Sequence, residues 1–279
     1  MALADRAPWC YESVMTLAPD PVLLDVSQEG VATITLNRPD KRNAFDELLI
    51  ANLREVFETL KGADHVRVVF LRGAGETFSA GADIDWMRRQ GERTQSDNED
   101  DALALAHMLK ALHELPQLTV ALVQGAAMGG GAGLVAASDV AVALKDARFR
   151  FSEVTLGLTP ATISPYVVAA IGQRWANALF ATAESFDGVF AERTGLVQYA
   201  VDDAAGLNAM MEHLADLAIA AAPGAVADSK ALVRFVAGHK IDESLAKETA
   251  RRIAARRTSA EGKEGLSAFL EKRKPEWRT

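Results

Sequence analysis

Cysteine is almost absent from this chain of 279 residues, since Cys10 is the single one. One cysteine excludes an intramolecular disulfide framework and a zinc cluster built on cysteines. Chains without disulfides are typical of a reducing compartment, so we expect a cytoplasmic protein in which Cys10 has no catalytic part.

Excess positive charge and long uninterrupted apolar runs are also missing. The net charge of −8 disfavours a nucleic-acid partner. The segment Met1–Pro8 contains Asp5 and Arg6 and no apolar core, so no secretory signal is evident. The most apolar stretch, 120–137, has the length of a membrane span but is interrupted by five glycines. We therefore interpret it as a buried strand, a turn and a buried helix, and expect no membrane partner.

Signals of common catalytic and metal-binding sites are lacking as well. No Gly-x-Ser-x-Gly elbow is present, and no two of the five histidines have the spacing of a ligand pair. We expect neither a metal nor a redox cofactor.

Strand-like and helix-like runs alternate along the first 200 residues. Residues 22–26 and 31–36 are rich in β-branched and apolar side chains on either side of a Gln-Glu-Gly turn, which predicts a hairpin. The acidic stretch 90–101 is expected to be a solvated, mobile loop. This alternation is typical of a layered α/β core. Further strands are expected at 66–71, 119–124, 140–144 and 147–151, and helices at 45–60 and 102–115.

Beyond Asp202 the pattern becomes almost wholly helical. Helices are expected over 204–222, 224–237, 241–256 and 259–274, with Pro223 and Gly238 as punctuation. We therefore divide the chain into a core, 1–202, and a helical C-terminal region, 203–279, of a kind that packs on the core or on a neighbouring subunit.

Two glycine turns carry the strongest chemical signal. Ala80-Gly81-Ala82-Asp83-Ile84 and Met128-Gly129-Gly130-Gly131 each follow a strand-like run and precede a helix-like one. A helix that begins there leaves peptide N–H groups free at its positive end. Two such turns together could hold one oxygen between two N–H donors, as an oxyanion hole requires. The pattern predicts polarisation of a carbonyl group.

These turns also occur in order with other recognisable motifs. Five segments appear at family-like spacing: Asn37-Arg38-Pro39 with Arg42-Asn43-Ala44, Phe78 to Ile84, Gly129 to Gly131, Phe151-Ser152-Glu153 with Leu156 to Pro160, and Ala268 to Arg273. Over residues 20–275 the chain thereby resembles the enoyl-CoA hydratase/isomerase (crotonase) family. The segment Ala161 to Tyr166 is most similar to the branch acting on methylglutaconyl-CoA or isohexenylglutaconyl-CoA.

This resemblance implies a fold, an assembly and a set of site residues. The fold would be a spiral of ββα units with a helical C-terminal part, assembled as a trimer or a dimer of trimers. The thioester oxygen of an acyl-CoA substrate would lie between the N–H groups of Ala82 and Gly130; coenzyme A is part of the substrate. The other substrate-binding residues implied are Lys41, Ala44, Ala80, Asp83, Ile84, Gly131 and Lys272, the last of them on the same or a neighbouring subunit.

The catalytic carboxylates agree with the family only in part. Many hydratases of the family use two glutamates, and the second is present here as Glu153 among apolar neighbours that could raise its pKa. The first position is Gly133, which cannot exchange a proton. The resemblance favours hydration of a 2-enoyl-CoA by Glu153 alone, and a Δ3,Δ2-enoyl-CoA isomerase with Glu153 as sole proton shuttle is the alternative.

Two further questions stay open from the sequence. A second carboxylate on the substrate would need a cation, for which Arg88, Arg89 and Arg150 are candidates. The chain could also be a non-catalytic acyl-CoA-binding protein, or one that binds RNA as some relatives do, although its acidic balance argues against RNA.

Overall fold

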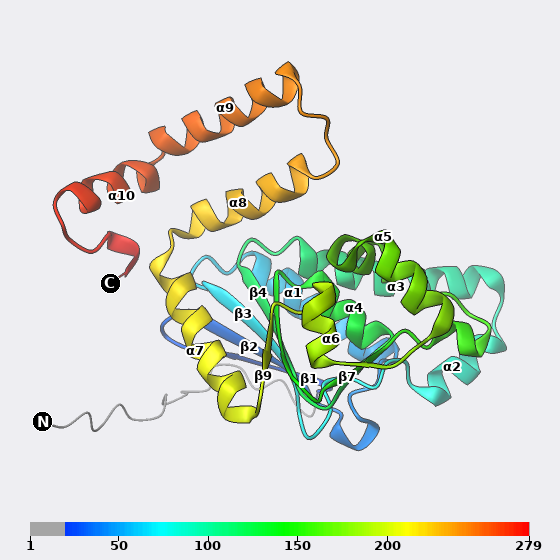
Figure 1. Ribbon diagram of the computed structural model, residues 1–279. Coiled ribbons are helices and arrows are strands. Elements are labelled where there is room, and N and C mark those ends of the chain that lie inside the picture. Colours follow the sequence, from blue (N-terminus) through cyan, green and yellow to red (C-terminus); the bar gives the residue numbers. More distant parts are fainter. Residues whose placement is uncertain (1–19, 279) are drawn as a thin grey trace, which may run out of the picture.

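A six-stranded sheet forms the centre of the computed structural model, which describes residues 20–278 (Figure 1). Cys10 and the segment Met1–Pro8 lie outside these residues. The first two strands form the expected hairpin, and every further neighbour pairs in parallel. In spatial order the strands are β1 (Val22–Val26), β2 (Val31–Leu36), β3 (Val68–Gly73), β4 (Leu118–Val123), β6 (Val140–Leu144) and β9 (Tyr199–Val201).

A second, three-stranded sheet lies at the carboxyl ends of the central strands. Its order is β5 (Ala126–Met128), β7 (Arg148–Arg150) and β8 (Phe186–Asp187). Gln124 and Gly125 lead directly from β4 into β5, so the apolar stretch 120–137 is strand, turn and helix, as predicted. None of the helices formed by residues 20–278 is long and apolar enough to cross a bilayer.

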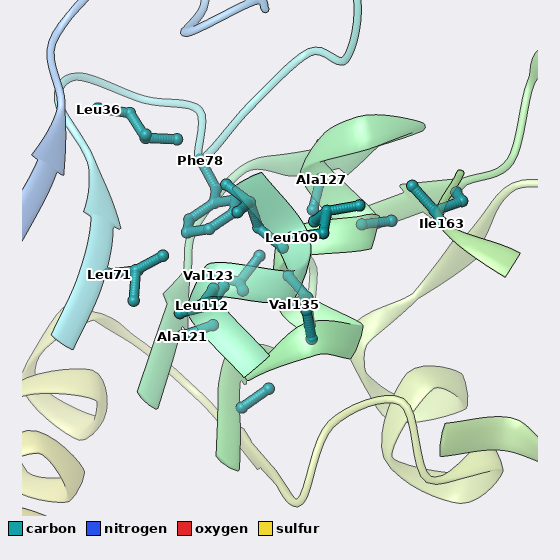
Figure 2. Close-up of a cluster of buried hydrophobic side chains, with 14 of the residues drawn as sticks. Leu36, Leu71, Phe78, Leu109, Leu112, Ala121, Val123, Ala127, Val135 and Ile163 are labelled. Carbon is teal, nitrogen blue, oxygen red and sulfur yellow. The ribbon is translucent and has the colours of Figure 1, made fainter. Parts of the chain in front are cut away.

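Helices cover both faces of the large sheet. One face of the sheet and the helices that pack on it form the larger apolar core. Figure 2 shows part of this core around Phe78, Leu109, Leu112 and Val135. The helices of this core are α1 (Glu47–Lys61), α2 (Ile84–Gly91), α3 (Gln95–His113), α4 (Gly130–Ala137), α5 (Ser164–Thr182) and α6 (Gly188–Thr194), with short 3₁₀ turns η1 (Pro39–Lys41) and η2 (Glu153–Leu156).

Most of the stretch 90–101 is helical where we expected a mobile loop, so that prediction is wrong; residues 92–94 form the turn between α2 and α3. The helix α3 starts at Gln95 because the Thr94 side chain accepts the N–H of Asp97, while the Asp97 carboxylate accepts the N–H of Thr94. This reciprocal cap satisfies two N–H groups that would otherwise be free. Acidic side chains in the first turn also suit the positive end of a helix.

The outer face of the sheet is covered by α7 (Ala204–Ala220), which packs Leu207, Leu214 and Ala218 against Phe70 and Val120. This helix therefore belongs to the layers around the sheet, although it lies beyond Asp202. The remaining elements form an arm that leaves these layers (Figure 1). They are α8 (Pro223–Val236), α9 (Glu243–Thr258), α10 (Ala260–Leu270) and η3 (Glu276–Arg278).

Polar contacts join this arm to the core. Lys230 forms an ion pair with Asp139 and donates to the carbonyl of Gln117. At the far end of the arm, Arg67 Nη1 lies 3.1 Å from the carbonyl oxygen of Trp277, and Arg67 Nη2 donates to the carbonyl of Ala221. Because Arg67 precedes β3, its guanidinium fixes both ends of the arm to one place beside the sheet.

Candidate active site

The first glycine turn is held in place by Phe45. The Phe45 N–H donates to the carbonyl of Gly81 at 2.7 Å, and the Phe45 carbonyl accepts the N–H of Asp83 at 2.8 Å. In such a parallel bridge the residue between the two, Ala82, directs its own N–H away from Phe45. Among residues 20–278 that N–H donates to no other protein group.

The second glycine turn lies directly against the same phenylalanine. Gly130 is the first residue of α4, where peptide N–H groups have no partner inside the helix. A Cβ placed on Gly130 would lie 3.0 Å from Phe45 Cδ2, and one on Gly131 would lie 2.7 Å from Ser79 Cβ. Only glycine allows this close approach. Phe45 therefore touches both predicted N–H donors, Ala82 through its peptide and Gly130 through its ring.

A network around Arg38 supports the first turn. Arg38 Nη1 lies 2.8 Å from Asp46 Oδ2, and Nη2 lies 3.3 Å from Asp83 Oδ2. The other oxygens of the two carboxylates cap helices: Asp46 Oδ1 accepts from Leu49 N, and Asp83 Oδ1 accepts from the N–H groups of Asp85 and Trp86. One guanidinium thus links the beginnings of α1 and α2, on either side of Ala82.

The pKa of Asp83 reflects this environment. Burial alone would raise it, but the N–H groups of Trp86 and Asp85 and the charges of Lys41 and Arg38 outweigh burial and lower the pKa. The Asp83 side chain, only 8% exposed, is therefore a charged helix cap.

Asn43, completely buried, fastens the loop before Phe45. Its amide donates to the carbonyls of Ala74 and Thr77 at 2.9 and 2.7 Å, and its Oδ1 accepts the N–H of Arg38. Its φ of 55° is in the left-handed region, where asparagine is tolerated better than most residues. The motifs around Arg38 and Asn43 therefore build the backbone of the site.

Glu153 reaches the second turn through the small sheet. Met128 of β5 pairs with Arg150 of β7, and the N–H of Gly129 donates to the carbonyl of Arg150 at 3.0 Å. The chain then places Glu153 in η2, with its Oε1 3.2 Å from where a Cβ on Gly129 would lie. The carboxyl group is thus next to the turn that presents the N–H of Gly130.

The Glu153 carboxyl is set up for proton transfer. Within the described part of the chain, its Oε2 is buried and has no hydrogen-bond partner. Burial raises the pKa of Glu153, and a bond from its own backbone N–H opposes this shift. A carboxyl next to the turn that presents the N–H of Gly130 can take a proton from, or give one to, a carbon next to a polarised carbonyl.

Comparison with known proteins agrees with this geometry. Residues 26–279 match the family model described as enoyl-CoA hydratase/isomerase. The chain belongs to the enoyl-CoA hydratase/isomerase family. It is therefore an enzyme of α/β class with the crotonase-like fold that the motifs predicted.

Relatives of this family match along most of their length. A short-chain-enoyl-CoA hydratase of Clostridium acetobutylicum is 31% identical over 90% of this chain and 95% of its own. A Legionella pneumophila structure described as enoyl CoA hydratase/isomerase (crotonase) has 46% identity and a TM-score of 0.86, covering 92% of this chain and 99% of that one. An enoyl-CoA hydratase from Shewanella pealeana has 40% identity and a TM-score of 0.90, with coverages of 93% and 97%.

The substrate-binding residues implied by the crotonase resemblance are brought together except for one. Ala80 lies in the same loop as Ala82, and Ala44 precedes Phe45 in the loop that pairs with it. Lys41 Nζ lies 3.5 Å from Asp85 Oδ2 at the start of α2. Ile84 is 71% exposed beside them. Lys272 follows α10 in the arm, which Figure 1 shows on the side away from α2, so one chain does not bring it to the site.

The candidate arginines for a second substrate carboxylate have other surroundings. Arg89 Nη2 lies 2.9 Å from Glu47 Oε1, and Arg150 Nε donates to the carbonyl of Ala183 at 2.7 Å. Arg88 is exposed on α2.

The sequence did not reveal that Phe45 contacts both glycine turns, or that Arg38 links the beginnings of α1 and α2. Phe45 was expected only as the beginning of a helix, although its position before the Asp46 cap could have indicated a fixed loop.

Proposed function

We propose that this protein hydrates a 2-enoyl-CoA thioester, with Glu153 as its acid and base. The observation that carries the proposal is the place of the Glu153 carboxyl, next to the Gly129 turn and the free N–H of Gly130. The N–H groups of Ala82 and Gly130 would bind the thioester oxygen and stabilise an enolate.

One carboxyl is sufficient for both proton transfers. The Glu153 carboxylate takes a proton from water as the water oxygen bonds to C3, and the electrons of the double bond move to the thioester oxygen. The protonated Glu153 then returns the proton to C2, which restores the carboxylate. This needs no cofactor beyond the coenzyme A of the substrate.

A Δ3,Δ2-enoyl-CoA isomerase is the second candidate. It is favoured by Gly133, which leaves Glu153 without a second carboxylate. In that reaction Glu153 would take a proton from C2 of a 3-enoyl-CoA and deliver it to C4.

Finer features belong to the same proposal. We propose a branched, glutaconyl-type acyl group because of the segment Ala161 to Tyr166. We also propose a homotrimer or a dimer of trimers in the cytoplasm, with the region 203–279 supplying contacts between subunits. The arm exposes large apolar side chains that suit such contacts, among them Ile241, Phe269 and Leu270. In that assembly Lys272 would approach a neighbouring subunit's coenzyme A.

The test is turnover of three esters by the purified protein: 3-methylglutaconyl-CoA, crotonyl-CoA and trans-3-hexenoyl-CoA. Hydration removes the absorbance of the conjugated enoyl thioester, and isomerisation of the 3-enoyl ester creates it. We expect hydration of at least one 2-enoyl ester, lost in Glu153→Gln and kept in Glu184→Gln, an exposed glutamate. Binding of the esters without turnover, unchanged in Glu153→Gln, would instead identify a non-catalytic acyl-CoA-binding protein.

A further inference from the structure

The position of the missing carboxylate, Gly133, is already filled by another residue. A Cβ on Gly133 would lie 2.4 Å from Ile163 Cγ2, 3.1 Å from Ile163 Cβ and 3.8 Å from Leu109 Cδ1. Ile163 is 2% exposed and lies at one end of the apolar cluster in Figure 2. With Ile163 in place, no side chain fits at position 133.

Ile163 and Glu153 both lie at the beginning of α4. Gly129 is the N-cap residue of this helix, and the N–H of Gly133 donates to the Gly129 carbonyl at 3.0 Å in the first turn. Glu153 Oε1 occupies the space in front of Gly129, and Ile163 occupies the space in front of Gly133. The carboxyl group and the isoleucine therefore both pack against the first turn of α4.

Ile163 offers Glu153 neither a proton nor a hydrogen bond. In the described part of the chain Glu153 Oε2 is buried and unpartnered. An apolar wall disfavours the charged carboxylate, which agrees with the raised pKa of Glu153.

We propose that Ile163 is a specificity-determining residue that restrains hydration relative to proton relocation at this site. It does so by filling the place in front of Gly133, where a second carboxylate or an additional water would stand. The inference rests on the proposed function of Glu153.

The two reactions differ in their need for this space. In relocation the C2–H bond breaks, its proton goes to the Glu153 carboxylate and its electrons to the thioester oxygen; the same proton then bonds to C4. No water takes part. Hydration adds a water oxygen to C3 and needs that water to be oriented by polar neighbours. Removing carbon atoms from Ile163 should therefore help hydration only.

The experiment compares Ile163→Val and Ile163→Ala with the wild-type protein, using crotonyl-CoA for hydration and trans-3-hexenoyl-CoA for isomerisation. We expect the ratio of hydration to isomerisation to rise about tenfold in Ile163→Ala, as one added hydrogen bond in the transition state would give, and to stay near the wild-type value in Ile163→Val, which keeps Cγ2. The acid limb of the kcat/KM profile should move to lower pH, because water beside Glu153 favours its carboxylate.

Ile171→Ala is the matched control, since Ile171 is buried in α5 at 5% exposure away from Gly133. It should lower stability and leave both the ratio and the pH profile unchanged. Equal loss of both activities in Ile163→Ala, with an unmoved acid limb, would overturn the inference alone. A wild-type protein with neither activity would overturn the proposed function first. Ile163→Val keeps Cγ2 and is the control in which the place stays filled. Ile163→Cys has one γ atom where isoleucine has two, so a folding failure of Ile163→Ala does not end the test.

Discussion

The ring of Phe45 packs against the Cα of Gly130, at the beginning of α4. The peptide of the same residue brackets Ala82 with hydrogen bonds of 2.7 and 2.8 Å. One residue, through its peptide and its ring, therefore sets how far apart the two proposed oxyanion donors lie. It does this from the loop before α1, far from both glycine turns in the sequence.

Shortening this side chain should impair turnover more than binding. In Phe45→Leu the ring that spaces Gly130 from Ala82 is lost, and we expect kcat to fall about tenfold with little change in KM, because a displaced donor acts mainly on the enolate. Steady-state kinetics on the best ester checks this. Phe57→Leu, another fully buried phenylalanine of the same core, should cost comparable stability and leave kcat near the wild-type value.

Removal of Arg38 should affect both stability and activity. Arg38→Ala leaves Asp83 buried without its cationic partner and frees the beginnings of α1 and α2. We expect a loss of about 3 kcal/mol in the free energy of unfolding, measured with urea, and a lower kcat/KM. Arg38→Lys keeps the charge but not the two-sided fork, so it should be intermediate. Equal stability of all three proteins would contradict the assigned role.

The pH dependence of activity should reveal the buried carboxyl. Catalysis as a base needs the Glu153 carboxylate, and burial raises its pKa above the ordinary 4.5. We therefore expect kcat/KM to fall as the pH is lowered through a value above 4.5. An acid limb at or below 4.5, measured between pH 4 and 9 in buffers of constant ionic strength, would show that the carboxyl is solvated during turnover.

The stability of the protein should also depend on pH through Glu153. It should fall as the pH rises, whereas activity should increase. Because the folded pKa is raised, the folded protein holds this proton more tightly than the unfolded chain, and stability is lost as the pH rises from about 4.5 through the folded value. Glu153→Gln removes this loss. Its Tm should match wild type near pH 4 and exceed it at pH 8, whereas Glu184→Gln should track wild type at both.

Gly133→Ala sets helix propensity against steric fit. Propensity alone would stabilise α4 by about 1 kcal/mol. The new Cβ would lie 2.4 Å from Ile163 Cγ2, however, and overpacking of a buried site costs about 1–3 kcal/mol, so we expect net destabilisation in urea unfolding. In the double variant Gly133→Ala/Ile163→Ala the contact with Cγ2 is gone and only the Cβ of residue 163, at 3.1 Å, remains, so the alanine at 133 should be less destabilising. Gly91→Ala, at a helix position with open space around it, is the control for propensity.

Much of this architecture could be predicted from local patterns. The hairpin of β1 and β2, the glycine turns and the position of Glu153 are all encoded in short segments with clear signals. The beginning of α3 was mistaken for a loop because four acidic residues suggested solvent, while the capping pair Thr94 and Asp97 was overlooked. There the cap, and not the overall charge, determined the structure.

The contacts that shape the site could not be predicted in this way. Phe45 meets Gly130, and Ile163 fills the space at Gly133, across 85 and 30 residues of chain. A glycine in the sequence shows that a side chain is missing, but only the folded chain shows which neighbour takes its place. Strands of two or three residues, such as β5 and β8, are likewise held by their partners and have little pattern of their own.

The hydrogen bond from Arg67 to the carbonyl of Trp277 spans 210 residues. During synthesis Arg67 leaves the ribosome long before Trp277 is added. The sheet can therefore form while this hydrogen bond is still absent. The contact between Trp277 and Arg67 can form only after Trp277 has been added, whereas Lys230 of α8 can pair with Asp139 earlier. Closure of so large a loop is entropically costly and depends on a sheet that is already in place. Docking of η3 should therefore follow formation of the sheet, and ribosome-bound chains stalled before Trp277 should carry a core that lacks this contact.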